Sequence, residues 1–558
     1  MGKIFVFGNE LTKKWQQNIG DSNYIQMPSF TLNEDGERKL SEFVINNIRD
    51  SKAIIIDVET ISPELCLAFA MAIRLSLFET KAAALSPILF ISGTTQDILT
   101  GFKYSPIILT GSIAFDLPEN ANDALDAMEP LSPNEYKTKF LDVIKIIPNA
   151  TEGKHSVANQ WGADVLSRIV VGNETNNELI KKARLSLYFR YVRALSLGVK
   201  DIEQLVQNVE TPSVSSSCKI IDAAGKKILL IDDEADKGWD YVLRKMLPNT
   251  EFRTICEQVP DYASFSDEAK AEIESSKYDL IFLDLRMNGI QEEDLLNPND
   301  FSGMKILKKI KNQNKGNQVI MFTASNKAWN MKALLEAGAD GYYIKESPEY
   351  AFPTSYSESN ANELVKTINR CLRRGYLREI AREIKTFKKI QSSFKYEETL
   401  FNNICIQLDV SYSLVASARS PQQFAFAYIS LEQVFEIISD ELLELDNYHY
   451  IIKDTQEECL NWILNSRSCQ GQTNYNWNDY PQWKKIASLY YQLWKGSDGT
   501  FGNQIMHLIE KRNAYIHNDK NTLNKKDSQG KKIHTDIFQA DGYICLFKAV
   551  TTILRFLY

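Results

Sequence analysis

Paired cysteines, long apolar runs and an excess of positive charge are all missing from this sequence. Its 558 residues contain eight scattered cysteines, and no two of them form a Cys-x-x-Cys pair. This pattern excludes a disulfide-stabilised secreted protein and a cysteine zinc site, so we expect buried thiols in a cytoplasmic protein. No run of about 18 apolar residues is present, and we therefore predict no membrane-spanning helix.

The net charge and the start of the chain exclude two more classes of protein. The formal charge is −8, so any nucleic-acid contact has to come from a local basic patch rather than from the whole surface. The first apolar run, KIFVF, is too short for a signal peptide and is typical of a β-strand. With 44% hydrophobic and 24% charged residues, the composition is that of a folded globular protein.

Alternating strand and helix patterns divide the chain into blocks. Short apolar runs followed by helical stretches occur twice, which predicts a multi-domain protein with two flavodoxin-like parallel sheets. The last block is helical without convincing β-alternation, which adds an all-α bundle. The predicted segments are an α/β domain at 1–125, a helical spacer at 126–210, a linker at 211–225, an α/β domain at 226–359, a connector helix at 360–399 and a helical bundle at 400–558.

Polar residues end four of the apolar runs in the second α/β block. Asp232 and Asp233 follow KKILLI, Asp284 ends DLIFLD, Thr323 ends VIMFT, and Lys345 ends GYYIK. Parallel strands place such residues together at the carboxyl edge of the sheet. Three carboxylates gathered there would repel one another unless a hard cation such as Mg²⁺ bound them. A carboxylate beside Mg²⁺ and a lysine is equipped to attack a phosphoryl group.

This block resembles the receiver domain of bacterial response regulators. The resemblance implies that Asp284 is the phosphoacceptor and that a sensor histidine kinase or a phosphotransfer protein is the partner. It further implies a Mg²⁺ site and a conformational switch. The implied metal ligands are Asp232, Asp233, Asp284 and the carbonyl of Arg286, and the implied switch residues are Thr323, Tyr342 and Lys345.

Two departures from the receiver pattern concern the face that binds partners. Glu346 follows the lysine where the family usually has proline. The segment IQEEDLLNPND, after Gly289, lengthens the loop that follows the phosphoacceptor. The residues expected to carry the phosphoryl chemistry are unaffected.

The first α/β block repeats the second in outline, because KIFVFGNE aligns with KILLIDDE and AIIIDVE with LIFLDLR. Asp57 takes the place of the phosphoacceptor, and Ser92 takes the place of the hydroxyl residue. Gly8 and Asn9 stand where the acidic pair should be, and no lysine ends PIILTGS. Without the pair, Mg²⁺ loses its charged ligands. We therefore predict a degenerate receiver that takes no phosphate, with an unrelated flavodoxin-like domain as the alternative.

In the C-terminal block, Arg512 and Asn513 precede His517, and an earlier amphipathic helix carries Glu432 among apolar residues. The block resembles the HEPN superfamily of prokaryotic helical domains, whose nuclease members carry Arg, a polar residue and His at this spacing. The resemblance implies an endoribonuclease that needs no metal, in which His moves a proton and Arg holds the scissile phosphate. Residues five apart on a helix lie about 140° apart, and family members bring two motifs together by forming a homodimer.

Lysines crowd the stretch around this motif, as expected for contacts with an RNA backbone. The alternative is a solvated loop. The candidate RNA-binding residues are Lys511, Lys520, Lys525 and Lys526.

Taken together, the sequence predicts a phosphorelay-controlled effector in which receiver phosphorylation regulates a HEPN-type ribonuclease. Antiphage or stress defence is the setting that the resemblance implies. The alternative is a non-enzymatic response regulator or phosphate sink, whose C-terminal bundle only dimerises or binds a partner.

Overall fold

In a computed structural model, the chain forms two compact units. One contains Met1–Lys308 and Val319–Leu372, and the other contains Lys309–Gln318 and Arg373–Tyr558. The described part of the chain contains no helix long and apolar enough to cross a membrane. The described residues are 3–8, 22–49, 51–93, 101–147, 153–172, 177–207, 220–256, 262–275, 277–287, 292, 295, 297–324, 328–348, 352, 354–446, 449–459, 461–463, 468–470, 482–494, 499–517 and 535–558.

Six described cysteines are present as thiols, and the expectation of burial holds for only three of them. The buried ones are Cys66, Cys371 and Cys459, whereas Cys256, Cys405 and Cys545 are half-buried.

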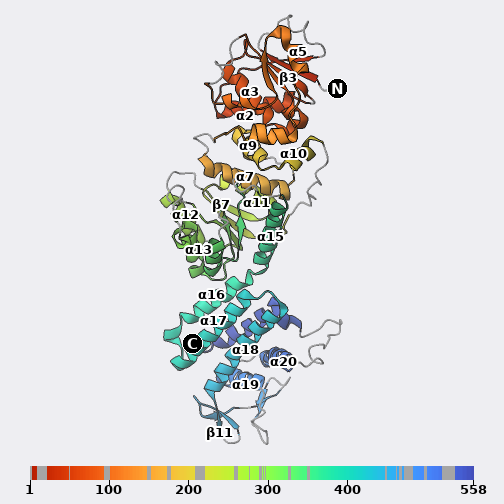
Figure 1. The fold of residues 1–558 in the computed structure, drawn as a ribbon. Helices are drawn as coiled ribbons and strands as arrows, with labels where there is room; N and C mark the ends of the chain where they lie inside the picture. The colour runs from red at the N-terminus through yellow and green to blue at the C-terminus, as the bar shows by residue number, and fades with distance from the viewer. Residues whose placement is uncertain are drawn as a thin grey trace. The chain divides into compact units, whose positions relative to one another are not determined.

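Five parallel strands form the first sheet, in the order β2-β1-β3-β4-β5 (Figure 1). Successive side chains of a strand point to opposite faces, so Ile54 and Ile56 pack with α2 and α3 while Ile55 packs with α5. The strands are β1 Lys3–Gly8, β2 Ser22–Gln26, β3 Ser51–Asp57, β4 Ile88–Ile91 and β5 Ile113–Asp116. The helices are α2 Glu34–Asn47, α3 Pro63–Arg74, α4 Leu77–Thr80 and α5 Ala121–Asp126.

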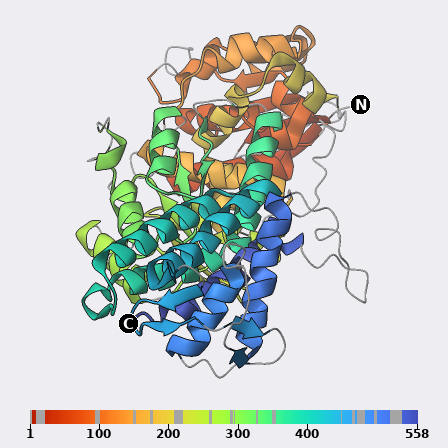
Figure 2. The ribbon, with the colours of Figure 1, turned by 90° about the horizontal axis from the view of Figure 1, so that it is seen from below.

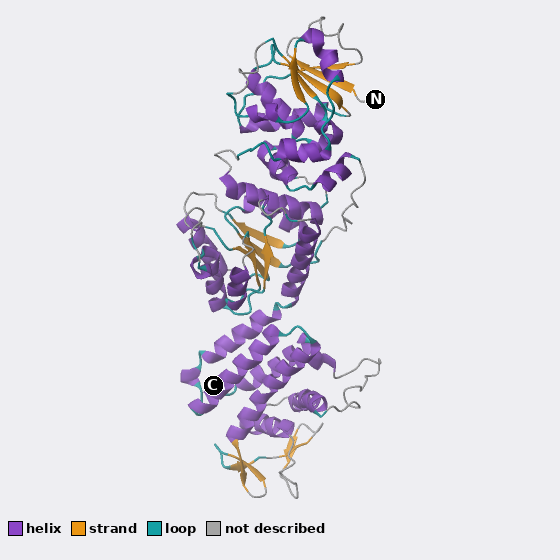
Figure 3. Ribbon diagram, viewed as in Figure 1, coloured by secondary structure: helices purple, strands orange, loops and turns teal. Residues whose placement is uncertain are grey.

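The second sheet has the same topology, with the order β7-β6-β8-β9-β10, and both predicted parallel sheets are confirmed. Figure 3 shows the strands of each sheet enclosed by helices, as the continuous apolar runs require. The strands are β6 Lys227–Ile231, β7 Glu251–Ile255, β8 Leu280–Asp284, β9 Val319–Thr323 and β10 Gly341–Ile344. The helices are α11 Trp239–Met246, α12 Tyr262–Ser275, α13 Ser302–Gln313, α14 Ala328–Glu336 and α15 Thr354–Arg373.

The helices that the sequence assigns to one spacer belong to two different cores. Ala163 and Leu166 of α7 are buried in the core of the second sheet, together with Ile180 of α8. Leu187 and Ile202, from α9 and α10, are buried in the core of the first sheet. The apolar stripe of each helix decides this division, because each stripe has a different sheet to cover. The helices are α6 Pro133–Glu135, a π-helical turn at Tyr136–Leu141, α7 Gly153–Val170, α8 Glu178–Leu185, α9 Leu187–Leu195 and α10 Val199–Val206.

Two more predicted segments differ from the structure. The end of the predicted linker is part of a folded domain, because Ile221 and Ala223 are buried in the core of the second sheet. The connector is not one helix. It breaks between Arg373, where α15 ends, and Tyr376, where α16 (Tyr376–Lys388) begins, and Gly375 lies in this break. Glycine there removes the side chain that would favour a continued helix.

The second unit is largely helical, as predicted, and α17 and α18 lie side by side in both ribbon views (Figure 1 and Figure 2). Besides α16, its described helices include α17 Glu398–Ser417, α18 Pro421–Leu442, α19 Gln482–Trp494, α20 Gly499–Ile516 and α22 Ala540–Leu554. It also contains short antiparallel strands that the sequence analysis missed. They are β11 Leu443–Asp446, β12 His449–Ile452, β13 Glu457–Glu458, β14 Asn461–Ile463 and β15 Ser468–Gln470, too short to show alternation.

Candidate functional site

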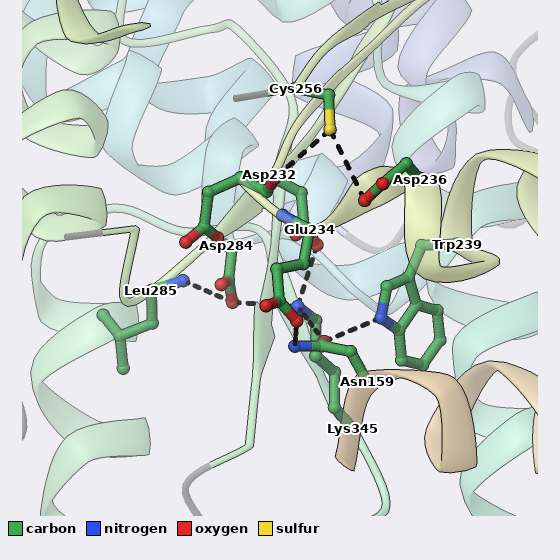
Figure 4. A network of polar contacts seen from close by, with 10 residues as sticks. Asn159, Asp232, Glu234, Asp236, Trp239, Cys256, Asp284, Leu285 and Lys345 are labelled. Carbon is green, nitrogen blue, oxygen red and sulfur yellow. Dashed lines mark hydrogen bonds and ion pairs between the residues drawn. The ribbon is translucent and has the colours of Figure 1, made fainter. Parts of the chain in front are cut away.

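The carboxyl ends of the second sheet's strands bring the predicted site residues together. Asp284 is the last residue of β8, Thr323 is the last of β9, and Asp232 and Lys345 directly follow β6 and β10. All four are buried. The strand order reverses between β6 and β8, and this switch point is where parallel sheets place their sites. Figure 4 shows Asp232, Asp284 and Lys345 converging.

The ammonium group of Lys345 holds the carboxylates together. Its Nζ lies 2.8 Å from Oδ2 of Asp232 and 3.3 Å from Oδ1 of Asp284. Burial lowers the pKa of Lys345, but Asp232 and Asp284 raise it by more, so the amine stays charged. Burial raises the pKa of the Asp284 carboxyl, while Lys345 and the N–H of Leu285, which donates to Oδ1 at 2.8 Å, favour its charged form.

The third carboxylate, Asp233, has no such ion pair among the described residues. Oδ1 of Asp233 is buried and accepts no hydrogen bond within the described structure. Burial, with Asp284 and Asp232 nearby, raises the pKa of Asp233 far above the usual range. Ligand oxygens of Asp232, Asp233 and Asp284 lie within 4.8 Å of one another, so the three can share a cation. Oxygen donors and an unpaired buried carboxylate oxygen fit Mg²⁺.

The other predicted site residues take different positions. Thr323 is buried, and its main-chain oxygen accepts the N–H of Lys345 at 2.7 Å. Tyr342, on β10, is 40% exposed, so its side chain is partly in contact with solvent. Arg286 follows β8 and is half-buried, with its guanidinium 4.5 Å from the centre of the Phe301 ring.

The lengthened loop after the phosphoacceptor position has a structural role that the sequence analysis missed. Glu292 is buried, and its carboxylate accepts the main-chain N–H and the hydroxyl of Ser302, at 2.6 and 3.0 Å. The hydroxyl oxygen of Ser302 also accepts the N–H of Met287 at 2.9 Å. An acid at the start of a helix stabilises its free N–H groups, so Glu292 fixes α13 beside Asp284.

Asn159, which lies outside the predicted receiver segment, also contacts the site. The amide oxygen of Asn159, on α7, accepts from Nζ of Lys345 at 3.0 Å and from Nε1 of Trp239 at 2.9 Å (Figure 4). Nothing in the helical pattern around Asn159 points to this contact, because it depends on where α7 packs.

The corresponding edge of the first sheet has a different chemistry. Asp57 is buried at the end of β3, and its Oδ1 accepts the N–H of Glu59 at 3.0 Å. Gly8 lies where the second sheet carries Asp232, while Asn9 is outside the described residues. Ser92 follows β4 and is half-buried. Among the described residues, only the group around Asp284 gathers three possible metal ligands.

Arg512, in the C-terminal unit, is engaged with acids of a neighbouring helix. Its Nε lies 3.4 Å from Glu432 and its Nη2 lies 2.9 Å from Glu436, both on α18. Nη1 donates to the side chain of Asn513 at 2.9 Å. Burial raises the pKa of the Glu432 carboxyl to about 7, although Arg512 opposes the shift. The guanidinium therefore neutralises acids of its own fold.

The remaining residues of the predicted nuclease site are less constrained. His517 is exposed, just beyond the end of α20, and its N–H donates to the carbonyl of Asn513. Lys511 forms an ion pair with Asp536 at 2.7 Å, so it is not a free cation. The other predicted RNA-binding residues, Lys520, Lys525 and Lys526, lie outside the described residues.

Comparisons with known families agree with the two α/β predictions. Residues 228–353 match the response regulator receiver domain, and residues 8–115 match the inactive receiver domain. The second match confirms the prediction of a degenerate first copy. No curated protein shows significant similarity to the chain. The helical C-terminal region is assigned by neither match, and the predicted HEPN resemblance gains no support from them.

Changing Asp233 should separate charge repulsion from cation binding. Without a divalent cation, the folded chain must either protonate Asp233 or carry its buried charge, and Asp233→Asn removes this cost, so it should raise the free energy of unfolding by on the order of 1 kcal/mol. Mg²⁺ should stabilise the unchanged chain by about 2.7 kcal/mol at about 100 times its Kd, and stabilise Asp233→Asn much less. Thermal unfolding with EDTA or Mg²⁺ measures both. Asp236→Asn, in the same loop, should respond to Mg²⁺ like the unchanged chain, and an equal response from Asp233→Asn would contradict the assignment.

Glu432 should make the stability of the C-terminal unit depend on pH. Its pKa is higher in the folded chain, about 7 against 4.5, so the folded state binds the proton more tightly. Its stabilising contribution is therefore complete below pH 4.5 and is lost as the pH rises through 7. Amide hydrogen exchange of α18 at several pH values measures this loss. Glu432→Gln should flatten the dependence, whereas Glu436→Gln should keep most of it; an equally steep dependence in Glu432→Gln refutes the idea.

Proposed function

We propose that the chain is a response regulator in which phosphorylation of Asp284 controls the C-terminal helical unit. The observation that carries this proposal is the buried Asp284, 3.3 Å from Lys345 and grouped with Asp232 and Asp233, inside a segment that matches receiver domains. A carboxylate with a raised pKa beside a fixed ammonium group is a competent nucleophile for phosphorus.

The phosphoryl transfer needs only groups at this edge of the sheet. A carboxylate oxygen of Asp284 attacks phosphorus and forms a new P–O bond, while the bond to the donor breaks and its electron pair leaves with the donor. Acetyl phosphate would release acetate, and a phosphohistidine partner would release histidine. Lys345 is close enough to donate to the charge that develops on the phosphoryl oxygens.

A divalent cation, which we propose to be Mg²⁺, completes the charge balance. Asp232, Asp233 and Asp284 would hold it, with the carbonyl of Arg286 as a further ligand implied by the receiver resemblance. The cation supplies neutralisation of the three carboxylates and of the phosphoryl oxygens. The partner is then a sensor histidine kinase or a phosphotransfer protein, because these carry the labile phosphoryl group that the site accepts.

Thr323 and Tyr342 are the proposed switch. Thr323 is buried beside the strand that carries Asp284, within reach of a group added there. Tyr342 precedes Lys345 on β10 and is 40% exposed, so an inward rotation of its ring changes the surface of the domain. Movement of both residues would convert a local charge into a change of surface.

For the output, we propose a metal-independent endoribonuclease that works as a homodimer. The exposed His517 supports this candidate, since it is free to contact RNA next to Arg512 and Asn513. The ion pairs of Arg512 with Glu432 and Glu436 favour a second candidate, in which the unit dimerises or binds a partner without catalysis. The two candidates differ in whether the chain cuts RNA.

Asp284→Asn should abolish phosphorylation by acetyl phosphate in the presence of Mg²⁺, because the amide has no charged oxygen for attack. A phosphate-affinity gel, in which the phosphorylated chain migrates more slowly, measures the loss. Asp57→Asn is the matched control and should label like the unchanged chain, since the first domain lacks the acidic pair. A slow band that persists in Asp284→Asn would overturn the assignment.

His517→Ala should abolish RNA cleavage without changing thermal unfolding, because an exposed histidine contributes little to stability. Cleavage of total cellular RNA and tRNA should continue in EDTA and leave 2′,3′-cyclic phosphate ends, which end-group analysis detects. His507→Ala, in the same helix, is the matched control and should cut normally. Cleavage that needs a metal refutes the mechanism, and no cleavage with or without phosphodonor selects the non-enzymatic candidate.

A further inference from the structure

Helix α7 approaches the receiver site closely, although it precedes the segment that matches receiver domains. A Cβ atom added to Gly162 would lie 2.8 Å from the carbonyl oxygen of Glu346 and 2.9 Å from the Trp239 ring. Gly238 has φ +123°, and a Cβ atom there would lie 2.9 Å from Ala163. Two glycines therefore allow a backbone contact that any larger residue would prevent.

This close packing of α7 places the side chain of Asn159 at the site. Asn159 is 3% exposed, and its side chain lies between Lys345, Trp239 and Glu234 in Figure 4. Its Oδ1 accepts from the ammonium and the indole, while its Nδ2 donates to Glu234 at 2.8 Å. Two donors face the oxygen and a carboxylate faces the nitrogen, so this network fixes the orientation of the amide.

The ammonium group of Lys345 faces three acceptors at unequal distances. Asp232 lies at 2.8 Å and Asn159 at 3.0 Å, whereas Asp284 lies at 3.3 Å. The longest contact is the weakest, and it is the one that points at the phosphoacceptor. A phosphoryl oxygen on Asp284 can take this N–H while the two shorter bonds hold the ammonium in place.

We infer that Asn159 is a positioning residue for phosphoryl transfer to Asp284, acting through Lys345, so that α7 completes the receiver site in cis. The inference rests on the proposed function, since it describes how Lys345 is held for that reaction. In this arrangement Asn159 acts on the phosphoacceptor through its hydrogen bond to Lys345. Its loss should therefore leave an N–H of Lys345 without an acceptor in a buried site and let the ammonium drift.

Rates of phosphorylation of the full chain by acetyl phosphate with Mg²⁺, measured over a range of donor concentrations, test the inference. Asn159→Ala should lower the maximal rate about tenfold, as expected for one charged hydrogen bond. The half-saturating donor concentration should stay the same, because Asn159 acts through Lys345 and not on the donor itself. The matched control is Ser156→Ala, which removes a 2.5 Å hydrogen bond from α7 to Glu234 but leaves Lys345 untouched. It should label at the normal rate.

A double variant keeps the test valid if Asn159→Ala unfolds. Asn159→Asp combined with Glu234→Gln restores an acceptor for Lys345 and reverses the polarity of the second hydrogen bond, so it should recover most of the rate. A double variant as slow as Asn159→Ala would overturn the inference. Equal slowing of Asn159→Ala and Ser156→Ala would also overturn it, since the effect would then be general loosening of α7.

The outcomes distinguish the inference from the proposed function. If the unchanged chain takes no phosphoryl group, the proposed function fails and the inference falls with it. If the unchanged chain and Asn159→Ala label at the same rate, the inference alone fails.

Discussion

The buried ammonium group of Lys345 is the interaction on which the receiver site depends. It faces Asp232 and Asp284, and burying carboxylates without a cation beside them would cost several kcal/mol. One amine cannot balance three acids, so Asp233 keeps an unpaired oxygen and a strongly raised pKa. The unbalanced negative charge is what the proposed cation would neutralise. Stability at this edge of the sheet is lower than it could be, and this unbalanced charge accompanies the reactivity that we propose for Asp284.

The first domain shows what remains when this charge is removed. It keeps the strand order and the buried Asp57, but glycine replaces the first acid. A parallel sheet with apolar strands folds without the site, because burial of side chains on both faces stabilises it. The domain without the acidic pair therefore still provides a core for α9 and α10.

In the C-terminal unit, the charge of Arg512 faces acids of the same fold. Arg512 offsets the burial of Glu432 on α18, which lies among the apolar residues of the core. An arginine tied to two acids has less freedom to bind a phosphate than one facing solvent. Any RNA chemistry at His517 has to work beside this pairing.

The sequence by itself determined both sheets, the receiver residues and the loss of the acidic pair in the first copy. These features depend on local patterns: continuous apolar strands, and charged residues placed where a strand ends. Tertiary structure alone decided the contribution of Asn159 and the division of α7 to α10 between two cores. The pairing of Arg512 with Glu432 and Glu436 was also decided there. Each of these features either joins residues that are distant in the chain or depends on which core a helix packs against. Helical periodicity shows that a helix has an apolar face, but it does not show what that face packs against.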